Sequence, residues 1–196
     1  MKLKSCFLLC LSVVSLLFVT SCATNIRMAN TTNPPPSEAF QAFTVFVVEP
    51  VTLDPAYAKS VTNNKALAKI QERLSAHLGV TIDAWNRDGT SKGAPRRTLV
   101  IKPVVTKIKF IGGAARFMVG NMAGSSAVIV NVTVTEKETG KTVSSPEFYA
   151  SANGFSGGWT VGVTDNLMLD RIAGTIANYI KTNYASAVGG VTGAGI

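Results

Sequence analysis

The chain has 196 residues, a length that suits a single domain. Its 19 Lys and Arg residues outnumber its 11 Asp and Glu residues, but they are scattered and are not interleaved with aromatic residues. This pattern argues against a nucleic-acid partner. We interpret the positive charge as a solvated surface; the alternative is contact with anionic lipid head groups or acidic parts of a cell wall.

Residues 1–21 have the three parts of a secretion signal. Lys2 and Lys4 supply the positive start, residues 6–19 are apolar apart from two serines, and small residues precede Cys22. The apolar part is roughly 14 residues long, whereas a transmembrane helix needs about 20. We therefore expect residues 1–21 to be removed as a signal peptide.

Cys22 is the predicted site of a lipid anchor. The run Val19-Thr20-Ser21-Cys22 resembles the lipobox of bacterial lipoproteins, which has an aliphatic residue, two small residues and a cysteine. A thiol can take a diacylglyceryl group as a thioether, and two or more acyl chains, such as palmitate, give stable anchoring. The alternatives are an ordinary cleaved signal with a coincidental cysteine and an uncleaved membrane anchor.

The residue after Cys22 indicates which membrane holds the anchor. In lipoproteins similar to this one, Asp at that position favours retention in the inner membrane, and here it is Ala23. The resemblance implies an outer-membrane protein whose domain faces the periplasm. Cys6 and Cys10 belong to the removed segment, so the mature chain keeps Cys22 alone and forms no internal disulfide. We expect no metal and no cofactor.

Residues 22–42 are expected to form a flexible tether. They are polar, contain Pro34, Pro35 and Pro36, and offer too little apolar surface for a packed element. Proline-rich chain extends by about 3 Å per residue, which gives a reach of roughly 50 Å from the bilayer. The globular domain is expected at 43–184, and a flexible glycine-rich tail at 185–196.

The first half of the domain is predicted to contain one helix among strands. The helix begins at Asn63 or Asn64, has apolar residues at helical spacing and stops at Gly79. A long strand changes its inward-facing register near Pro103, which indicates a sheet edge or a bulge. The predicted segments are a strand at 43–49, the helix to Leu78, a short strand at 80–85, a loop at 86–95 and the long strand at 97–110.

The second half is predicted to be a hairpin followed by a helix. Valines at alternate positions from 128 to 134 are separated by polar residues, which is typical of a half-buried strand. Residues 138–141 turn this strand into a partner at 142–152, and a helix starts at Thr164 or Asp165 and runs to about Tyr184. The order of elements predicts an α+β fold: a single small domain with a mixed or mostly antiparallel sheet and two helices packed on one face.

Two glycine-rich segments are candidates for contact with a partner. Residues 112–124 carry Arg116 and Phe117 among small residues, and residues 153–162 carry two aromatic residues among glycines. One interpretation is an exposed recognition loop in each case. The alternatives are a close-packed connection for the first segment and a glycine-rich strand edge for the second. The candidate contact residues are Arg116, Phe117, Phe155 and Trp159.

No catalytic arrangement is apparent in the sequence. His77 is the only histidine, and no recognisable nucleophile or second metal ligand accompanies it. Four acids would support a cell-wall or glycan hydrolase only if they met in one pocket. We therefore expect a non-enzymatic binding or scaffolding module for an envelope protein or peptidoglycan; the alternatives are a hydrolase and a subunit of a secretion or assembly complex. The four acids are Glu49, Asp54, Asp165 and Asp170.

Part of the chain resembles a known family. The Gly/Ala-Arg-Phe-x-Val-Gly-x-x-Ala-Gly pattern within 112–124 is followed by the strand at 127–134 and by Thr139-Gly140-Lys141. Together these resemble an uncharacterised family of bacterial lipoproteins, domain of unknown function 4410. The resemblance implies a lipid-anchored α+β domain of the Gram-negative envelope and carries over no catalytic residues. More loosely, the order of elements is similar to that of envelope-assembly lipoproteins that share a fold with the N-terminal domain of the Tol-system propeller protein.

Overall fold

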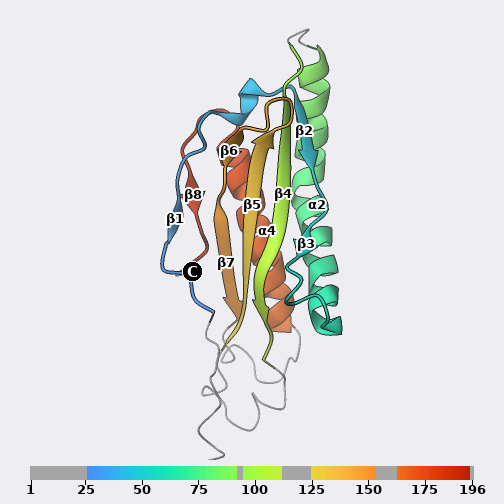
Figure 1. Ribbon diagram of the computed structural model, residues 1–196, viewed down its shortest axis with the longest axis vertical. Coiled ribbons are helices and arrows are strands. Elements are labelled where there is room, and N and C mark those ends of the chain that lie inside the picture. The colour runs from blue at the N-terminus through green and yellow to red at the C-terminus, as the bar shows by residue number, and fades with distance from the viewer. Residues whose placement is uncertain (1–25, 92–94, 112–124, 153–162, 195–196) are drawn as a thin grey trace, which may run out of the picture.

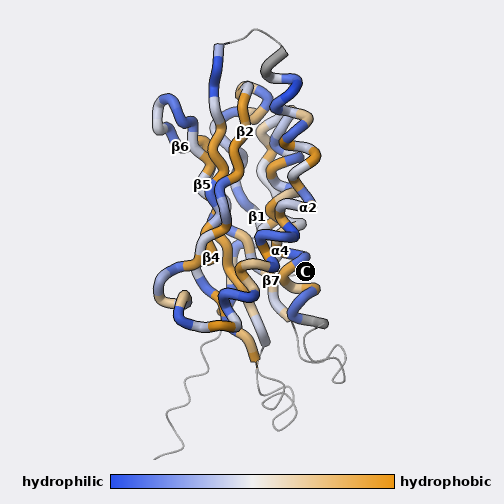
Figure 2. The backbone as a smooth tube through the Cα atoms, turned by 90° about the vertical axis from the view of Figure 1, so that its right-hand side faces the viewer, coloured by the Kyte–Doolittle hydropathy of each residue, from blue (hydrophilic) through white to orange (hydrophobic). Residues whose placement is uncertain are grey.

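The computed structural model describes residues 26–91, 95–111, 125–152 and 163–194. These residues form an α+β domain in which two helices pack on one face of a mixed sheet, as the sequence predicts (Figure 1). The view turned by 90° places both helices on the same side of the strands (Figure 2). The other face of the sheet has no helix over it in the described part of the chain.

Six strands form the main sheet, in the order β2–β4–β5–β6, with β3 beside β4 and β7 beside β5. The pairs of β2 and β3 with β4 are parallel, and the pairs made by β5 are antiparallel. A separate antiparallel pair joins β1 to β8. The elements are β1 (Thr32–Asn33), η1 (Phe40–Ala42), β2 (Val45–Val48), β3 (Thr52–Leu53), α2 (Val61–Ser91), β4 (Thr98–Lys109), β5 (Ser126–Glu136), β6 (Thr142–Ser144), β7 (Glu147–Ala152), α4 (Val163–Thr182) and β8 (Gly190–Val191).

The core lies between the sheet and the helices. The valines at alternate positions of β5 are fully buried and share one cluster with Ile70 and Leu74 of α2 and with Ile172 and Ile176 of α4. A two-residue period places the valines on one side of the strand, and helical spacing places these isoleucines and Leu74 on one stripe of each helix. Asn131 and Thr133, between the later valines, are half-buried on the uncovered face.

Helix α2 is longer than predicted. It continues through Gly79, so the predicted short strand at 80–85 is wrong and residues 86–91 are helical instead of forming a loop. Ile82 is buried, and Trp85 stacks on Tyr184 with ring centroids 4.0 Å apart, so the apolar stripe continues beyond the glycine. Glycine weakens a helix interior by about 1 kcal/mol, but packing of the following turns outweighs that preference.

Pro103 lies in the interior of the sheet, so the predicted edge position is wrong. It pairs with Val132 of β5, whose N–H donates to the carbonyl of Pro146 on the far side at 2.9 Å. The Pro103 nitrogen therefore points toward the gap between β2 and β3, where no ladder hydrogen bond is lost. A register shift does occur in β4, but between Val105 and Lys107.

The predicted hairpin after β5 is present, and its partner strand is divided. β6 pairs with the end of β5 and β7 pairs with the beginning, with Ser145 and Pro146 between them. Helix α4 agrees with the prediction, and its stripe at Leu169, Ile172, Ile176 and Ile180 is buried.

The segments predicted to be a flexible tether and tail belong to the fold wherever they are described. β1 lies in the first segment and β8 in the second, and they pair with each other. Ile26 and Phe40 are buried, and the side chain of buried Asn183 accepts the backbone N–H groups of Val188 and Gly189. Polar composition misled the prediction, because polar side chains here satisfy backbone groups in place of a longer sheet. The described domain therefore extends from residue 26 to residue 194.

Candidate functional site

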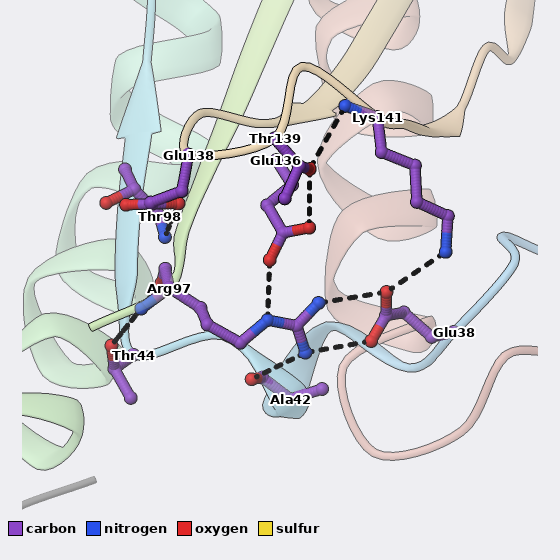
Figure 3. A network of polar contacts seen from close by, with 9 residues as sticks. All are labelled: Glu38, Ala42, Thr44, Arg97, Thr98, Glu136, Glu138, Thr139 and Lys141. Carbon is purple, nitrogen blue, oxygen red and sulfur yellow. Dashed lines mark hydrogen bonds and ion pairs between the residues drawn. The ribbon is translucent and has the colours of Figure 1, made fainter. Parts of the chain in front are cut away.

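Arg97 is the centre of a charged cluster at the end of the sheet where β2 and β4 begin (Figure 3). Its terminal nitrogens donate to the two carboxylate oxygens of Glu38 at 3.0 and 3.1 Å, and its Nε donates to Glu136 at 2.6 Å. The guanidinium carbon also lies 4.3 Å from the centre of the Phe43 ring. Paired contacts of this kind are the strongest that arginine makes with carboxylates.

Two groups of this cluster, Arg97 and Glu136, are stabilised in their charged forms. The hydrogen bond from Arg97, and then the one from the Thr139 hydroxyl at 2.7 Å, lower the pKa of Glu136. Hydrogen bonds to Glu38 and Glu136 raise the pKa of Arg97. Because the guanidinium is directed at protein oxygens, we interpret the cluster as a structural joint between the N-terminal segment, β4 and the turn after β5.

The uncovered face of the sheet is hollowed beside this joint. The hollow has a volume of about 370 Å³ and is lined by Val47, Val100 and Thr135, with Glu49 and Lys137 also at its surface. The Val47 side chain is 41% exposed, although it belongs to a strand of the main sheet. An apolar lining with a few charged groups is the usual character of a binding surface.

Lysines extend this surface along β4. Lys102 and Lys107 are exposed and pair in register with Thr133 and Ile129 of β5. Their register partners lie on the side of β5 away from the core valines, so both lysines belong to the uncovered face. This face therefore combines half-buried valines and threonines with positive charge.

The four acids considered for a hydrolase do not meet. Glu49 lines the hollow on the uncovered face, whereas Asp165 and Asp170 belong to α4 on the opposite face. Asp170 contacts Arg73 at 3.5 Å and His77 at 3.3 Å, which links α4 to α2. The remaining acid, Asp54, accepts the Ala56 N–H at 2.8 Å in the turn after β3.

The described residues contain neither a group of potential metal ligands nor a candidate membrane-spanning helix. In residues 26–91, 95–111, 125–152 and 163–194, no three His, Cys, Asp or Glu side chains lie close enough together to hold a metal ion. In the same residues, neither helix has the length and apolar character required to cross a membrane.

The residues that the sequence singles out lie elsewhere. Cys22 precedes the described residues, and the candidate contact residues Arg116, Phe117, Phe155 and Trp159 lie outside them as well. Conversely, no pattern in the sequence pointed to the Arg97 joint. Glu38 and Glu136 are 59 and 39 residues away from Arg97 along the chain, so only the fold brings them together.

Comparison with proteins of curated function yields no match. Among solved structures, the PelC dodecamer from Paraburkholderia phytofirmans is similar at 13% identity, with 73% of this chain and 93% of that chain covered and a TM-score of 0.41. The hypothetical protein CT253 from Chlamydia trachomatis has 15% identity, coverages of 72% and 98%, and a TM-score of 0.39. Lipoprotein GNA1162 from Neisseria meningitidis has 13% identity, coverages of 69% and 99%, and a TM-score of 0.27. Similarities this low support no conclusion about this chain.

A family comparison is more informative. The family described as a domain of unknown function (DUF4410) matches residues 37–152, which is more than half of the 196 residues. The matched region contains all six strands of the main sheet and helix α2, and it includes Glu38, Arg97 and Glu136 of the structural joint. The protein belongs to the DUF4410 family.

Proposed function

We propose that this protein is a lipid-anchored, non-enzymatic module of the bacterial cell envelope that binds an envelope partner. Cys22 would carry the lipid, and Ala23 favours the outer membrane, with the domain facing the periplasm. The partner would be an envelope protein or peptidoglycan. No cofactor is needed for this activity.

The observation that carries the binding role is the uncovered face of the sheet. An antiparallel sheet with one solvated face normally alternates apolar and polar residues cleanly. Here Val47 and Val100 line a hollow on that face, next to the charged residues Glu49 and Lys137. The nearby Lys102 adds positive charge, which favours a partner that carries negative groups, such as the carboxylates of peptidoglycan peptides or an acidic protein surface.

The anchor is tested by labelling cells with palmitate. The wild-type protein should incorporate the label, whereas Cys22→Ala should not, because the thioether can form only on the thiol. Equal labelling of the two forms would rule out the anchor and leave the binding role to be judged separately.

The binding role is tested by photo-crosslinking in cells from Thr133, on the uncovered face. A matched probe at Val80, which is 81% exposed on α2, reports on the opposite side of the domain. We expect a discrete product from Thr133 that is lost in a Lys102→Glu, Lys107→Glu variant, and no such product from Val80. The same products from both positions, or none from Thr133, would contradict the proposal.

A further inference from the structure

The chain before the described domain is too short to hold the domain far from its anchor. Ile26 is only 8% exposed and packs on Ala127 and Ile129, and the Tyr149 hydroxyl donates to the Ile26 carbonyl at 3.3 Å. Cys22 precedes Ile26 by four residues, which span at most about 14 Å when fully extended. The reach of roughly 50 Å expected from the sequence therefore does not apply.

The docking position of Ile26 identifies one end of the domain. Ala127 pairs with Lys109 and with Ser151, so Ile26 lies where β4 ends, β5 begins and β7 ends. Both helices begin at the same end, because residues from the starts of α2 and α4 line one hollow together with Phe110. Figure 1 shows these element ends together, at the lower end of the domain.

This end of the domain has the composition of a membrane-facing surface. Val61 and Leu167, in the first turns of α2 and α4, are 71% and 60% exposed, which is unusual for large apolar side chains. Basic residues predominate at this end of the domain: Arg27, Lys59, Lys65 and Lys109, against the acids Asp54 and Asp165.

The opposite end holds acidic and basic residues side by side, and Lys141 lies 3.8 Å from Glu38 there. It carries the Arg97 joint, in which Glu38 and Glu136 balance the arginine, and Glu138 accepts the Thr98 N–H at 2.8 Å. Basic groups near exposed apolar residues are attracted to an anionic surface. The length of chain between Cys22 and Ile26 therefore selects the end at which α2 and α4 begin, where exposed apolar and basic side chains occur together.

We propose that the end of the domain at which α2 and α4 begin rests on anionic lipid head groups. The proposal builds on the proposed anchor at Cys22, which places that end within a short distance of the bilayer. The basic residues interact with lipid phosphates, and Val61 and Leu167 contact the interfacial region. The long axis of the domain then stands away from the membrane, with the Arg97 joint at the distal end.

The orientation is tested with the purified lipidated protein in vesicles of phosphatidylethanolamine and phosphatidylglycerol that contain a nitroxide-labelled lipid. A fluorophore is attached to Leu167→Cys or, as a matched control, to Val188→Cys, which is 57% exposed. Val188 contacts Asn183 beyond the far end of α4, and a 20-residue helix is about 30 Å long. We expect the Leu167 probe to be quenched and the Val188 probe to keep its fluorescence.

Flotation of the same vesicles separates the two hypotheses. Protein that fails to float contradicts the anchor on which the proposal builds. Protein that floats, with both probes equally bright or equally quenched, retains the anchor and overturns the orientation. Quenching restricted to the Leu167 probe supports both.

A second experiment tests the lipid chemistry without the anchor. The mature chain carrying Cys22→Ser is mixed with the same vesicles and with phosphatidylcholine vesicles. Lys59→Glu with Lys65→Glu should weaken binding to the anionic vesicles. Each basic residue near an anionic surface contributes roughly a factor of five to the affinity, so we expect the affinity to fall roughly fivefold or more for each lysine replaced. Arg96→Glu with Lys181→Glu, at exposed positions just before β4 and at the end of α4, is the control. Equal effects of the two variants, or equal binding to both lipids, would overturn the proposal.

Discussion

Arg97 joins three parts of the chain that are distant in sequence, and its removal should weaken all three contacts. Arg97→Ala takes the charged donor from Glu38 and Glu136 and the cation from the Phe43 ring. We expect the free energy of unfolding to fall by about 1 to 2 kcal/mol, at the lower end for charged hydrogen bonds because Arg97 is partly exposed. Urea unfolding monitored by circular dichroism measures this change.

The neighbouring Arg96 provides the control, because it is exposed and lies outside the paired contacts of the cluster. Arg96→Ala should change the free energy of unfolding by less than about 0.5 kcal/mol. If the two variants lost the same free energy of unfolding, the paired hydrogen bonds of Arg97 would contribute no more to stability than its positive charge does.

Two asparagine side chains form hydrogen bonds with backbone groups of outer strands of the sheet. The Asn86 side chain of α2 accepts the Phe46 N–H at 2.6 Å and donates to the Phe46 carbonyl, and Asn33 does the same for the backbone of Glu147. Each side-chain amide thus takes the place of a peptide group from a neighbouring strand. Such contacts reduce the capacity of β2 and β7 to pair with another chain at these points.

At the scale of elements, the two glycines of α2 should respond in opposite ways to substitution. A Cβ at Gly79 would meet nothing within 4 Å, so Gly79→Ala should raise the free energy of unfolding by about 0.5 to 1 kcal/mol through helix propensity. A Cβ at Gly89 would collide with the Thr44 carbonyl, so Gly89→Ala should lower it. Thermal unfolding of the two variants tests the expected gain of stability in Gly79→Ala and the expected loss in Gly89→Ala. A loss of stability in Gly79→Ala would contradict the prediction.

The sequence predicted those elements whose packing follows a regular period. The alternate valines of β5 and the apolar stripe of α4 are each buried against the core. Their spacing along the chain was therefore sufficient to predict the strand and the helix. The prediction failed where a local signal competes with tertiary contacts. Gly79 looked like a helix stop, but the packing of Ile82 and Trp85 carries the helix past it.

Other features were beyond sequence reasoning because they depend on long-range contacts. The pairing of β1 with β8 joins residues about 160 positions apart and has no apolar pattern of its own. The same holds for the hollow on the uncovered face, which is formed by β2, β4 and the end of β5. In the sequence these residues look like any other strand residues, and only the fold brings them together.

At the scale of the whole molecule, the two ends of the chain depend on each other, and Gly189 is the point where this can be tested. Its φ is +79°, and a Cβ there would lie 2.5 Å from the Asn33 carbonyl. Gly189→Ala should therefore release the N-terminal segment from β8 and expose the bond after Arg27 to trypsin. The rate of cleavage after Arg27 measures this release.

Gly140 is the matched control for this experiment. Its φ is +70°, so alanine costs about 1 to 2 kcal/mol of backbone strain there too, but a Cβ would meet nothing within 4 Å. Gly140→Ala should leave cleavage after Arg27 at the wild-type rate. Faster cleavage in both variants would show that global destabilisation, and not the loss of β1–β8 contact, opens the segment.

The attachment of β1 has a mechanical consequence. From Ile26 the chain runs along the domain toward Glu38 and the distal end, held on the way by the Thr192 N–H to Thr31, the Thr192 hydroxyl to Asn30, and Asn33 to Glu147. Tension applied at the N-terminal end acts along this strand, so these hydrogen bonds are loaded together in shear and do not open one after another. The N-terminal segment should thus resist detachment under pulling force while the helices on the opposite face of the sheet carry little of the load.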